Sequence, residues 1–198
     1  MAKNSSSSKG GSEDYLSKIY TDTNVIIAYI NKNHELHKKA EEIINYVRGL
    51  GDNDQENQEV KPKVKLVTSQ FTVKELEAFY IGNYVSKEVG NLKDEKKTEN
   101  ITEATKQALE NSTNFVTDVL KRTNVEVVKV DECEVSMRAW GELKLLMPWL
   151  EIGDLHQIAA AEKIGASKFL TFDKRMLDLA HLIKSYTKIE VTDGSDLK

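Results

Sequence analysis

Short runs of β-branched and aromatic residues alternate along the chain with longer segments of helical periodicity, and this alternation limits the fold more than any other feature. Strands are predicted at 18–22, 64–68, 125–130, 168–172 and 188–191. Helices are predicted at 24–30, where the β-branched residues leave a strand as the alternative, and at 34–50, 69–80, 132–147, 154–164 and 174–183, with a further helical segment near 115–120. Because strands that alternate with helices pair in parallel, we predict an α/β fold, a three-layer α/β/α sandwich around a mainly parallel sheet of four to five strands.

The polar segments of the chain predict one domain with a tail and two insertions. Residues 1–17 contain four consecutive serines and paired glycines, which bury too little surface to offset the entropy of ordering, so we expect a flexible tail. Residues 18–198 have a length that suits a single domain. Polar insertions interrupt it near 51–62 and 83–112, and the second is expected to be either a helical hairpin or a mobile insertion.

Composition excludes several classes of protein. The single cysteine, Cys133, excludes an intrachain disulfide and a cysteine-cluster zinc site, and we interpret it as a buried small apolar residue. The longest apolar run, at 25–30, is far shorter than the roughly 20 residues that span a membrane, and no secretory signal is visible. We therefore expect a cytoplasmic protein with no membrane partner. A net charge of −4 argues against a protein that coats DNA nonspecifically, although it permits a local basic rim.

Four carboxylates are predicted to meet at one edge of the sheet. Asp22 ends the first predicted strand, Asp173 follows the fourth, Asp154 opens a helix, and Glu75 lies one turn into the helix after the second strand. Open parallel sheets bind ligands at the carboxyl ends of their strands. Each acid alone has an ordinary explanation as a helix cap, a turn residue or an exposed helical side chain. Their common position is what indicates a site.

Several carboxylates held close together raise one another's pKa unless a cation is present. Mg²⁺ and Mn²⁺ are hard cations that prefer such oxygen ligands. A metal site of this kind activates water and neutralises charge at a scissile phosphate. The four acids therefore predict metal-assisted hydrolysis of a phosphodiester.

Four motifs stand in the order that is typical of the PIN-domain family, which the sequence resembles from about residue 19 to its C-terminus. The motifs are T-D-T-N-V at 21–25, S-Q-F-T-V-K-E at 69–75, G-D-L-H-Q-I-A-A-A at 153–161 and L-T-F-D-K-R at 170–175. The resemblance implies that the family's catalytic and metal-binding acids are Asp22, Glu75, Asp154 and Asp173, with Mg²⁺ or Mn²⁺ as cofactor. It implies an endoribonuclease that cleaves single-stranded RNA, either a VapC-type toxin of a toxin–antitoxin pair or an archaeal-type RNA-processing nuclease.

Further residues are assigned roles around this quartet. Thr171 and Asn24 are expected to fix the carboxylates by hydrogen bonds. Lys74, Lys174 and Arg175 are expected to contact RNA phosphates, against the alternative that they form an ordinary solvated surface. Trp149 is expected to pack in the core or a loop, with stacking on an RNA base as the alternative. The resemblance also implies an antitoxin or RNA-processing partner protein and a homodimer.

Two other functional classes stay open. The first is a PIN-like module that binds RNA or assembles complexes with little catalysis, but such a scaffold has no use for four uncompensated acids. The second is a structure-specific DNA nuclease. No long helical arch or added DNA-binding motif supports it, although the insertion at 83–112 leaves it open.

Overall fold

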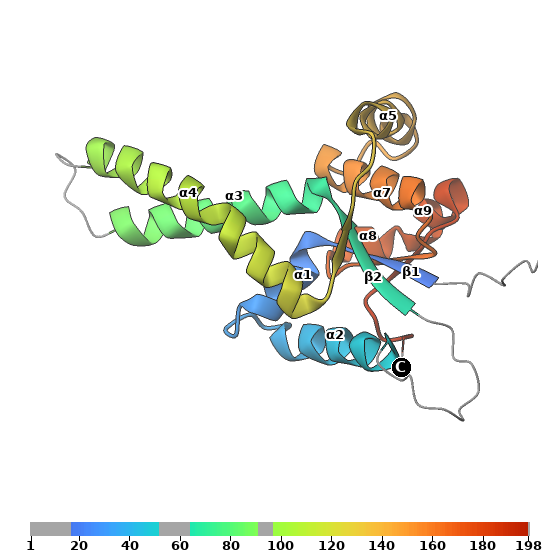
Figure 1. Ribbon diagram of the computed structural model, residues 1–198. Helices are drawn as coiled ribbons and strands as arrows, with labels where there is room; N and C mark the ends of the chain where they lie inside the picture. Colours follow the sequence, from blue (N-terminus) through green and yellow to red (C-terminus); the bar gives the residue numbers. More distant parts are fainter. Residues whose placement is uncertain (1–16, 52–63, 91–96, 198) are drawn as a thin grey trace, which may run out of the picture.

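The computed structural model describes residues 17–51, 64–90 and 97–197, and a sheet of five parallel strands lies at its centre (Figure 1). The strands are β1 (Ser17–Thr21), β2 (Val64–Ser69), β3 (Glu126–Val128), β4 (Lys168–Leu170) and β5 (Glu190–Thr192). Their order is β3-β2-β1-β4-β5, and every neighbouring pair is parallel. The predicted α/β class is confirmed. β1 and β4 are neighbours, so the residues that follow them lie side by side.

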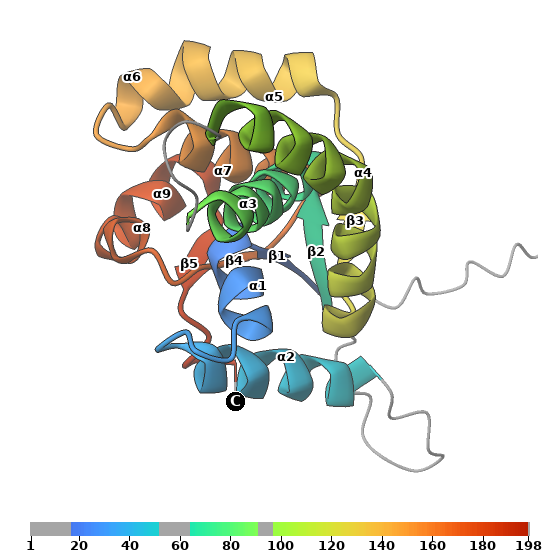
Figure 2. The ribbon, with the colours of Figure 1, turned by 90° about the vertical axis from the view of Figure 1, so that its left-hand side faces the viewer.

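Helices cover both faces of this sheet. They are α1 (Thr23–Ile30), α2 (His37–Gly51), α3 (Gln70–Val89), α4 (Lys97–Thr123), α5 (Glu132–Arg138), α6 (Lys144–Leu146), α7 (Ile152–Ile164), α8 (Lys174–Asp178) and α9 (Ala180–Thr187), with a π-helical segment, η2 (Ala139–Leu143), between α5 and α6. Alternate strand residues face opposite sides. Ile19 and Leu66 pack with α2, whereas Tyr20 and Phe169 pack with α5, α7 and α9 (Figure 2). The three-layer arrangement is therefore confirmed.

Helices α3 and α4 form a long hairpin that projects from the body of the protein (Figures 1 and 2). Small residues of α4 are buried against α3 at four-residue intervals, at Ala104, Ala108 and Ser112. Farther along, Tyr80 of α3 stacks on Phe115 of α4 with ring centroids 4.5 Å apart. Of the two alternatives for 83–112, the helical hairpin is therefore confirmed for the described parts, 83–90 and 97–112.

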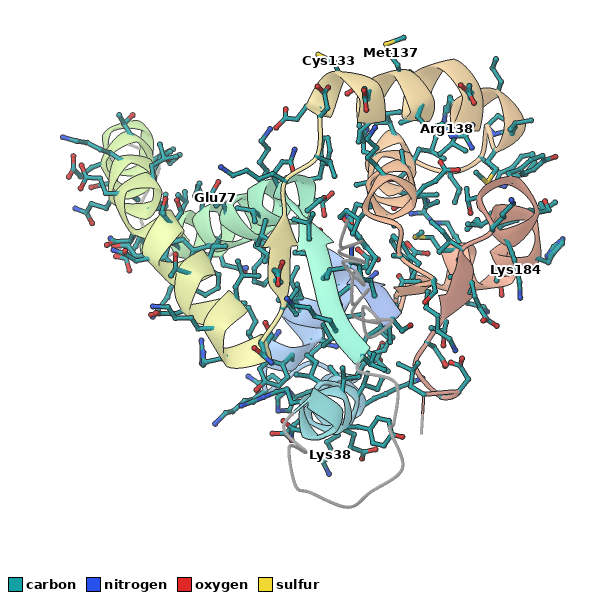
Figure 3. The ribbon with its side chains drawn as sticks, turned by 45° about the vertical axis from the view of Figure 1, so that its right-hand side comes forward. Lys38, Glu77, Cys133, Met137, Arg138 and Lys184 are labelled. Atoms are coloured by element: carbon teal, nitrogen blue, oxygen red, sulfur yellow. The ribbon has the colours of Figure 1, made fainter. Side chains whose placement is uncertain are left out.

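Some predictions lie outside the described residues or are wrong. Most of the proposed tail, 1–16, and most of the insertion near 51–62 are outside them, although β1 already begins at Ser17. Cys133 is exposed on α5 and points into solvent beside Met137, so its interpretation as a buried residue is wrong (Figure 3). The cause is its place on the outer side of α5, away from the sheet. None of the helices in the described ranges has the length and apolar character needed to cross a membrane.

Candidate active site

Asp22 occupies the point where β1 gives way to α1. Its backbone N–H donates to the carbonyl of Leu170 at 3.0 Å, which extends the pairing of β1 with β4 by one residue. Asp22 is the N-cap of α1, but its carboxylate makes no capping hydrogen bond there and is free to face the edge of the sheet. The residue is 6% exposed. A carboxylate is thus buried at the carboxyl end of the central strand.

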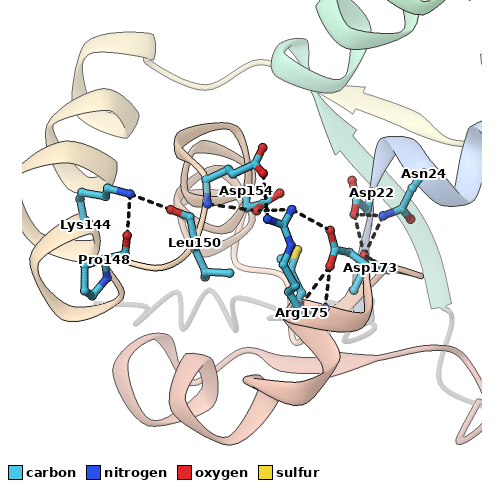
Figure 4. A network of polar contacts seen from close by, with 11 residues as sticks. Asp22, Asn24, Lys144, Pro148, Leu150, Asp154, Asp173 and Arg175 are labelled. Carbon is cyan, nitrogen blue, oxygen red and sulfur yellow. Dashed lines mark hydrogen bonds and ion pairs between the residues drawn. The ribbon is translucent and has the colours of Figure 1, made fainter.

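Two neutral side chains fix this carboxylate (Figure 4). Asn24 Nδ2 and Thr171 Oγ1 each donate to Asp22 Oδ2 at 2.6 Å. Asn24 Nδ2 also donates to Thr171 Oγ1 at 3.0 Å, and its Oδ1 accepts from the backbone N–H of Phe172 at 3.0 Å. The structure therefore places both residues on Asp22, and together they join the end of β1 to the end of β4.

Asp154 and Asp173 lie at the starts of two helices. Asp173 is the N-cap of α8, and its Oδ1 accepts from the backbone N–H groups of Arg175 and Met176 at 2.7 and 3.4 Å. Asp154 is not the N-cap of α7, which is Glu151; it is the third helical residue and accepts from the backbone N–H of Glu151 at 3.3 Å. Both acids sit at the positive ends of helix dipoles, which favour negative charge.

Glu75 reaches the same edge from α3. Its Oε2 accepts hydrogen bonds from Thr23 Oγ1 and, at 2.6 Å, from Gln157 Nε2. Gln157 is 4% exposed and is itself oriented by Thr72 Oγ1 at 3.3 Å. Sequence reasoning missed Thr23 and Gln157. The position of Gln157, three residues after Asp154 on the same helix face, was the available signal.

The four acids interact electrostatically. Burial, and to a lesser extent the charges of Glu75 and Asp154, raise the pKa of Asp22 to about 7 despite its hydrogen bond from Thr171. Burial and the charge of Asp173 also raise the pKa of Asp154, whereas Arg175 opposes that rise. Each acid therefore repels another member of the quartet when both are ionised, and a bound cation would offset this repulsion.

The donor chemistry fits a hard divalent cation, although no ready-made coordination sphere is present. Within residues 17–51, 64–90 and 97–197, no three His, Cys, Asp or Glu side chains converge closely enough to form one. Asp22 nevertheless accepts hydrogen bonds only from neutral groups and has no ion-pair partner in those ranges. A buried carboxylate with oxygen-bearing neighbours and no cation is a suitable ligand for Mg²⁺ or Mn²⁺.

The predicted RNA-contacting cations are in different situations. Arg175 donates to Glu151 Oε1 at 2.8 Å and lies 3.4 Å from Asp173 Oδ2 and 3.9 Å from Asp154 Oδ2 (Figure 4). Lys74 pairs with Glu132 at 2.8 Å. Lys174 is exposed and makes no ion pair within the described part of the chain. Of these three cations, only Lys174 is uncommitted, meaning that it has no ion-pair partner among the described residues.

A sizeable cavity lies elsewhere. It has a volume of about 480 Å³ and is lined in part by Arg48, Lys65, Leu120 and Asn124. These residues lie near the amino-terminal ends of β2 and β3, at the opposite edge of the sheet from the acids. The cavity is therefore separate from the carboxylate cluster.

The family model described as PIN domain matches residues 19–182, a range that contains all four acids. The chain belongs to the PIN domain family. The resemblance seen in the sequence is therefore confirmed. PIN domains are nucleases that generally use divalent metals, so this membership agrees with the chemistry of the carboxylate cluster.

This PIN domain is similar to solved structures of VapBC proteins. The 2.2 Å structure of VapBC-1 from nontypeable Haemophilus influenzae is 17% identical, covers 90% of this chain and 98% of its own, and has a TM-score of 0.51. VapBC2 from Rickettsia felis, bound to a DNA fragment from their promoter, is also 17% identical, with coverages of 88% and 98% and a TM-score of 0.47. A search of curated proteins finds no match. At this identity the likeness to VapBC-1 concerns the fold alone.

Thr171→Val tests the hydrogen bonds around Asp22 in this PIN domain. The Thr171 hydroxyl lowers the pKa of Asp22, so its loss is expected to raise that pKa above about 7. The acid limb of the pH–rate profile should then move to higher pH by roughly one to two units, since a hydrogen bond to a charged group contributes roughly 1.5–3 kcal/mol. Thr171→Ser keeps the hydroxyl and should restore the profile. An acid limb that does not move in Thr171→Val would contradict this role.

Proposed function

We propose that this PIN domain is a metal-dependent endoribonuclease that hydrolyses single-stranded RNA. Asp22, Glu75, Asp154 and Asp173 would bind Mg²⁺ or Mn²⁺. The observation that carries the proposal is the buried carboxylate of Asp22, whose pKa is raised to about 7 by burial and by neighbouring acids. A site that disfavours its own ionised form, on a fold whose members are nucleases, is best explained by a cation that binds there.

The residues of this chain have separate tasks in the proposed reaction. The divalent ion, when bound, supplies positive charge at the scissile phosphate and lowers the pKa of water. Asn24 and Thr171 hold Asp22 in one rotamer, which fixes the ligand before the substrate arrives. Thr23 and Gln157 hold Oε2 of Glu75. Its other oxygen, Oε1, lies next to Gly153, where an added Cβ would be 3.6 Å away. Glu75 is thereby positioned to orient the attacking water.

The cations at the rim bind the RNA backbone in this proposal. Lys174 is exposed next to Asp173 and is available for a phosphate without breaking an ion pair of the described residues. Arg175 already contacts Glu151, Asp154 and Asp173, so a phosphate would compete with these carboxylates for its guanidinium. We therefore assign Lys174 to the initial phosphate contact and Arg175 to a contact that forms in exchange for its carboxylate partners.

A partner protein of the antitoxin type is part of the proposal, and the likeness in fold to VapBC-1 supports it. RNA processing with a different partner is the alternative. The cytoplasmic location and the homodimer stay predictions. A small gene for an antitoxin next to the gene for this chain would favour the first role, and its absence would favour RNA processing.

Cleavage of a labelled single-stranded RNA in the presence of Mg²⁺ or Mn²⁺ tests the proposed function. We expect internal cuts with either metal, none after EDTA is added, and none in a single-stranded DNA of the same sequence. Activity that survives EDTA would contradict the metal-dependent mechanism, and equal cutting of DNA would favour the DNA-nuclease alternative. Metal-dependent binding of RNA without cleavage would favour a binding module.

A further inference from the structure

We propose that Trp149 stacks on an unpaired nucleobase beside the scissile phosphate and thereby selects single strands. The inference rests on the proposed function, because it assigns a substrate contact at the same site. The interpretation of Trp149 as a core residue is wrong, because the residue is 54% exposed. It lies in the connection between α6, which ends at Leu146, and α7, which begins at Ile152.

The connection that carries Trp149 is tightly held. Lys144 Nζ donates to the carbonyls of Pro148 and Leu150, both at 2.8 Å, and so fastens the residues on either side of Trp149 (Figure 4). Met147 and Leu150 are buried, at 0% and 1% exposure, and anchor the connection to the core. The indole is therefore exposed on a backbone that hydrogen bonds and buried side chains hold in place. A ring that is already positioned loses little entropy when it binds a flat partner.

Trp149 is also close to the acids. Glu151, two residues later, donates its backbone N–H to Asp154 and accepts a hydrogen bond from Arg175 with its side chain. Two residues of extended chain span at most about 7 Å, so the backbone of Trp149 lies within that distance of Glu151, which contacts both Asp154 and Arg175. A base on Trp149 would belong to a nucleotide adjacent to the phosphate at the acids.

The surroundings favour a nucleic acid strand over a protein as the occupant. Single strands are bound by aromatic rings that stack on bases and by cations that contact the backbone. Trp149 and the uncommitted Lys174 provide one of each at this site. The internal bases of a duplex are stacked on one another, so none of them can be placed on the indole.

The other tryptophan is a natural control. Trp140 lies on η2 and is 58% exposed, much like Trp149. Arg138, two residues earlier, pairs with Glu142 and Glu162. Lys144, one helical turn later, donates its hydrogen bonds to the carbonyls of Pro148 and Leu150. The nearest cations in the sequence are thus already engaged, and among the described residues Trp140 has no counterpart of Lys174 beside it.

Fluorescence of single-tryptophan variants tests the inference. The sequence has two tryptophans, so Trp140→Phe leaves Trp149 as the only one and Trp149→Phe leaves Trp140. The probe is a 2′-O-methylated single-stranded oligonucleotide, which resists cleavage, added in the presence of Mg²⁺. We expect saturable quenching in Trp140→Phe, no quenching in Trp149→Phe, and no quenching of either by a duplex of the same sequence.

Binding and kinetics provide a second readout. Trp149→Ala is expected to weaken oligonucleotide binding about 5- to 100-fold and to raise KM with little change in kcat, and Trp140→Ala is expected to leave both unchanged. If anisotropy shows binding while Trp149 is not quenched, or if only Trp140 responds, the inference is overturned. Normal metal-dependent cleavage with an unresponsive Trp149 would overturn this inference alone. Quenching without any cleavage would overturn the proposed nuclease while leaving the stacking contact in place.

Discussion

Asp154→Asn is expected to lower metal-dependent cleavage of single-stranded RNA at least a hundredfold without unfolding the protein. The change removes a negative charge from the proposed metal site, and a hundredfold loss corresponds to about 3 kcal/mol of activation free energy. The local structure should survive, because the amide oxygen of Asn can still accept the hydrogen bond that Asp154 accepts from the backbone N–H of Glu151. Initial rates at saturating Mg²⁺, together with the unfolding temperature, measure the two effects separately.

Asp178→Asn is the matched control for this experiment. Asp178 is an exposed acid at the end of α8, so the variant makes the same chemical change outside the quartet. We expect its activity to stay within a factor of two of the unchanged protein. If Asp154→Asn cleaves as fast as Asp178→Asn, Asp154 is not a member of the catalytic site.

Asp22→Asn is expected to make the metal-free protein more stable at pH 8 while abolishing cleavage. The pKa of Asp22 rises from its ordinary 3.8 to about 7 in the folded protein, so folding disfavours the ionised carboxylate. The resulting loss of stability begins above the unfolded pKa and grows until the pH passes about 7. A shift of this size corresponds to about 4 kcal/mol, part of which the buried amide N–H₂ of Asn would offset. We expect the unfolding temperature at pH 8 to rise by roughly 5–10 °C.

The difference in unfolding temperature between Asp22→Asn and the unchanged protein should depend on pH. Near pH 4 the carboxyl of Asp22 is protonated in the folded protein, so the variant has lost its advantage and should unfold at the same temperature as the unchanged protein or slightly below it. The unfolding temperature of the variant should rise relative to that of the unchanged protein between pH 4 and pH 7, and the difference should then stay constant. Mg²⁺ should stabilise the unchanged protein more than Asp22→Asn, since it binds the folded state through this carboxylate. A variant that is less stable than the unchanged protein at pH 8 would contradict the assignment of Asp22 as a destabilising ligand.

The positions of the acids were largely predictable, because they follow from sheet topology. Asp22 and Asp173 follow strands that pair in parallel as neighbours, and parallel neighbours end at the same edge. The end of α7 was also predictable from the sequence, because Gly165 adopts a positive φ of 73°, a conformation that glycine after a helix readily allows. Such features depend on pattern and backbone geometry alone.

Other features depend on contacts between distant side chains, which spacing does not specify. The hydrogen bond of Gln157 with Glu75 joins residues 82 positions apart. Trp149 is exposed in a connection whose carbonyls on either side are bound by Lys144, a contact that the sequence pattern does not reveal. The polar composition of 83–112 left a helical hairpin and a mobile insertion open, because the buried positions that pack its helices are as small as Ala104 and Ala108.

Helix α3 runs without a break from the outer end of the hairpin to the carboxylate cluster. The helix is unbroken over 20 residues, and Glu75 lies in its first two turns, about 20 Å from its far end. Thr23 and Gln157 tie Glu75 to α1 and α7. A force that tilts the outer end of α3 must therefore strain or break these two hydrogen bonds, and with them the alignment of Glu75 to Asp22. A molecule that binds the outer end of the hairpin and tilts α3 would therefore displace Glu75 without contacting any of the four acids.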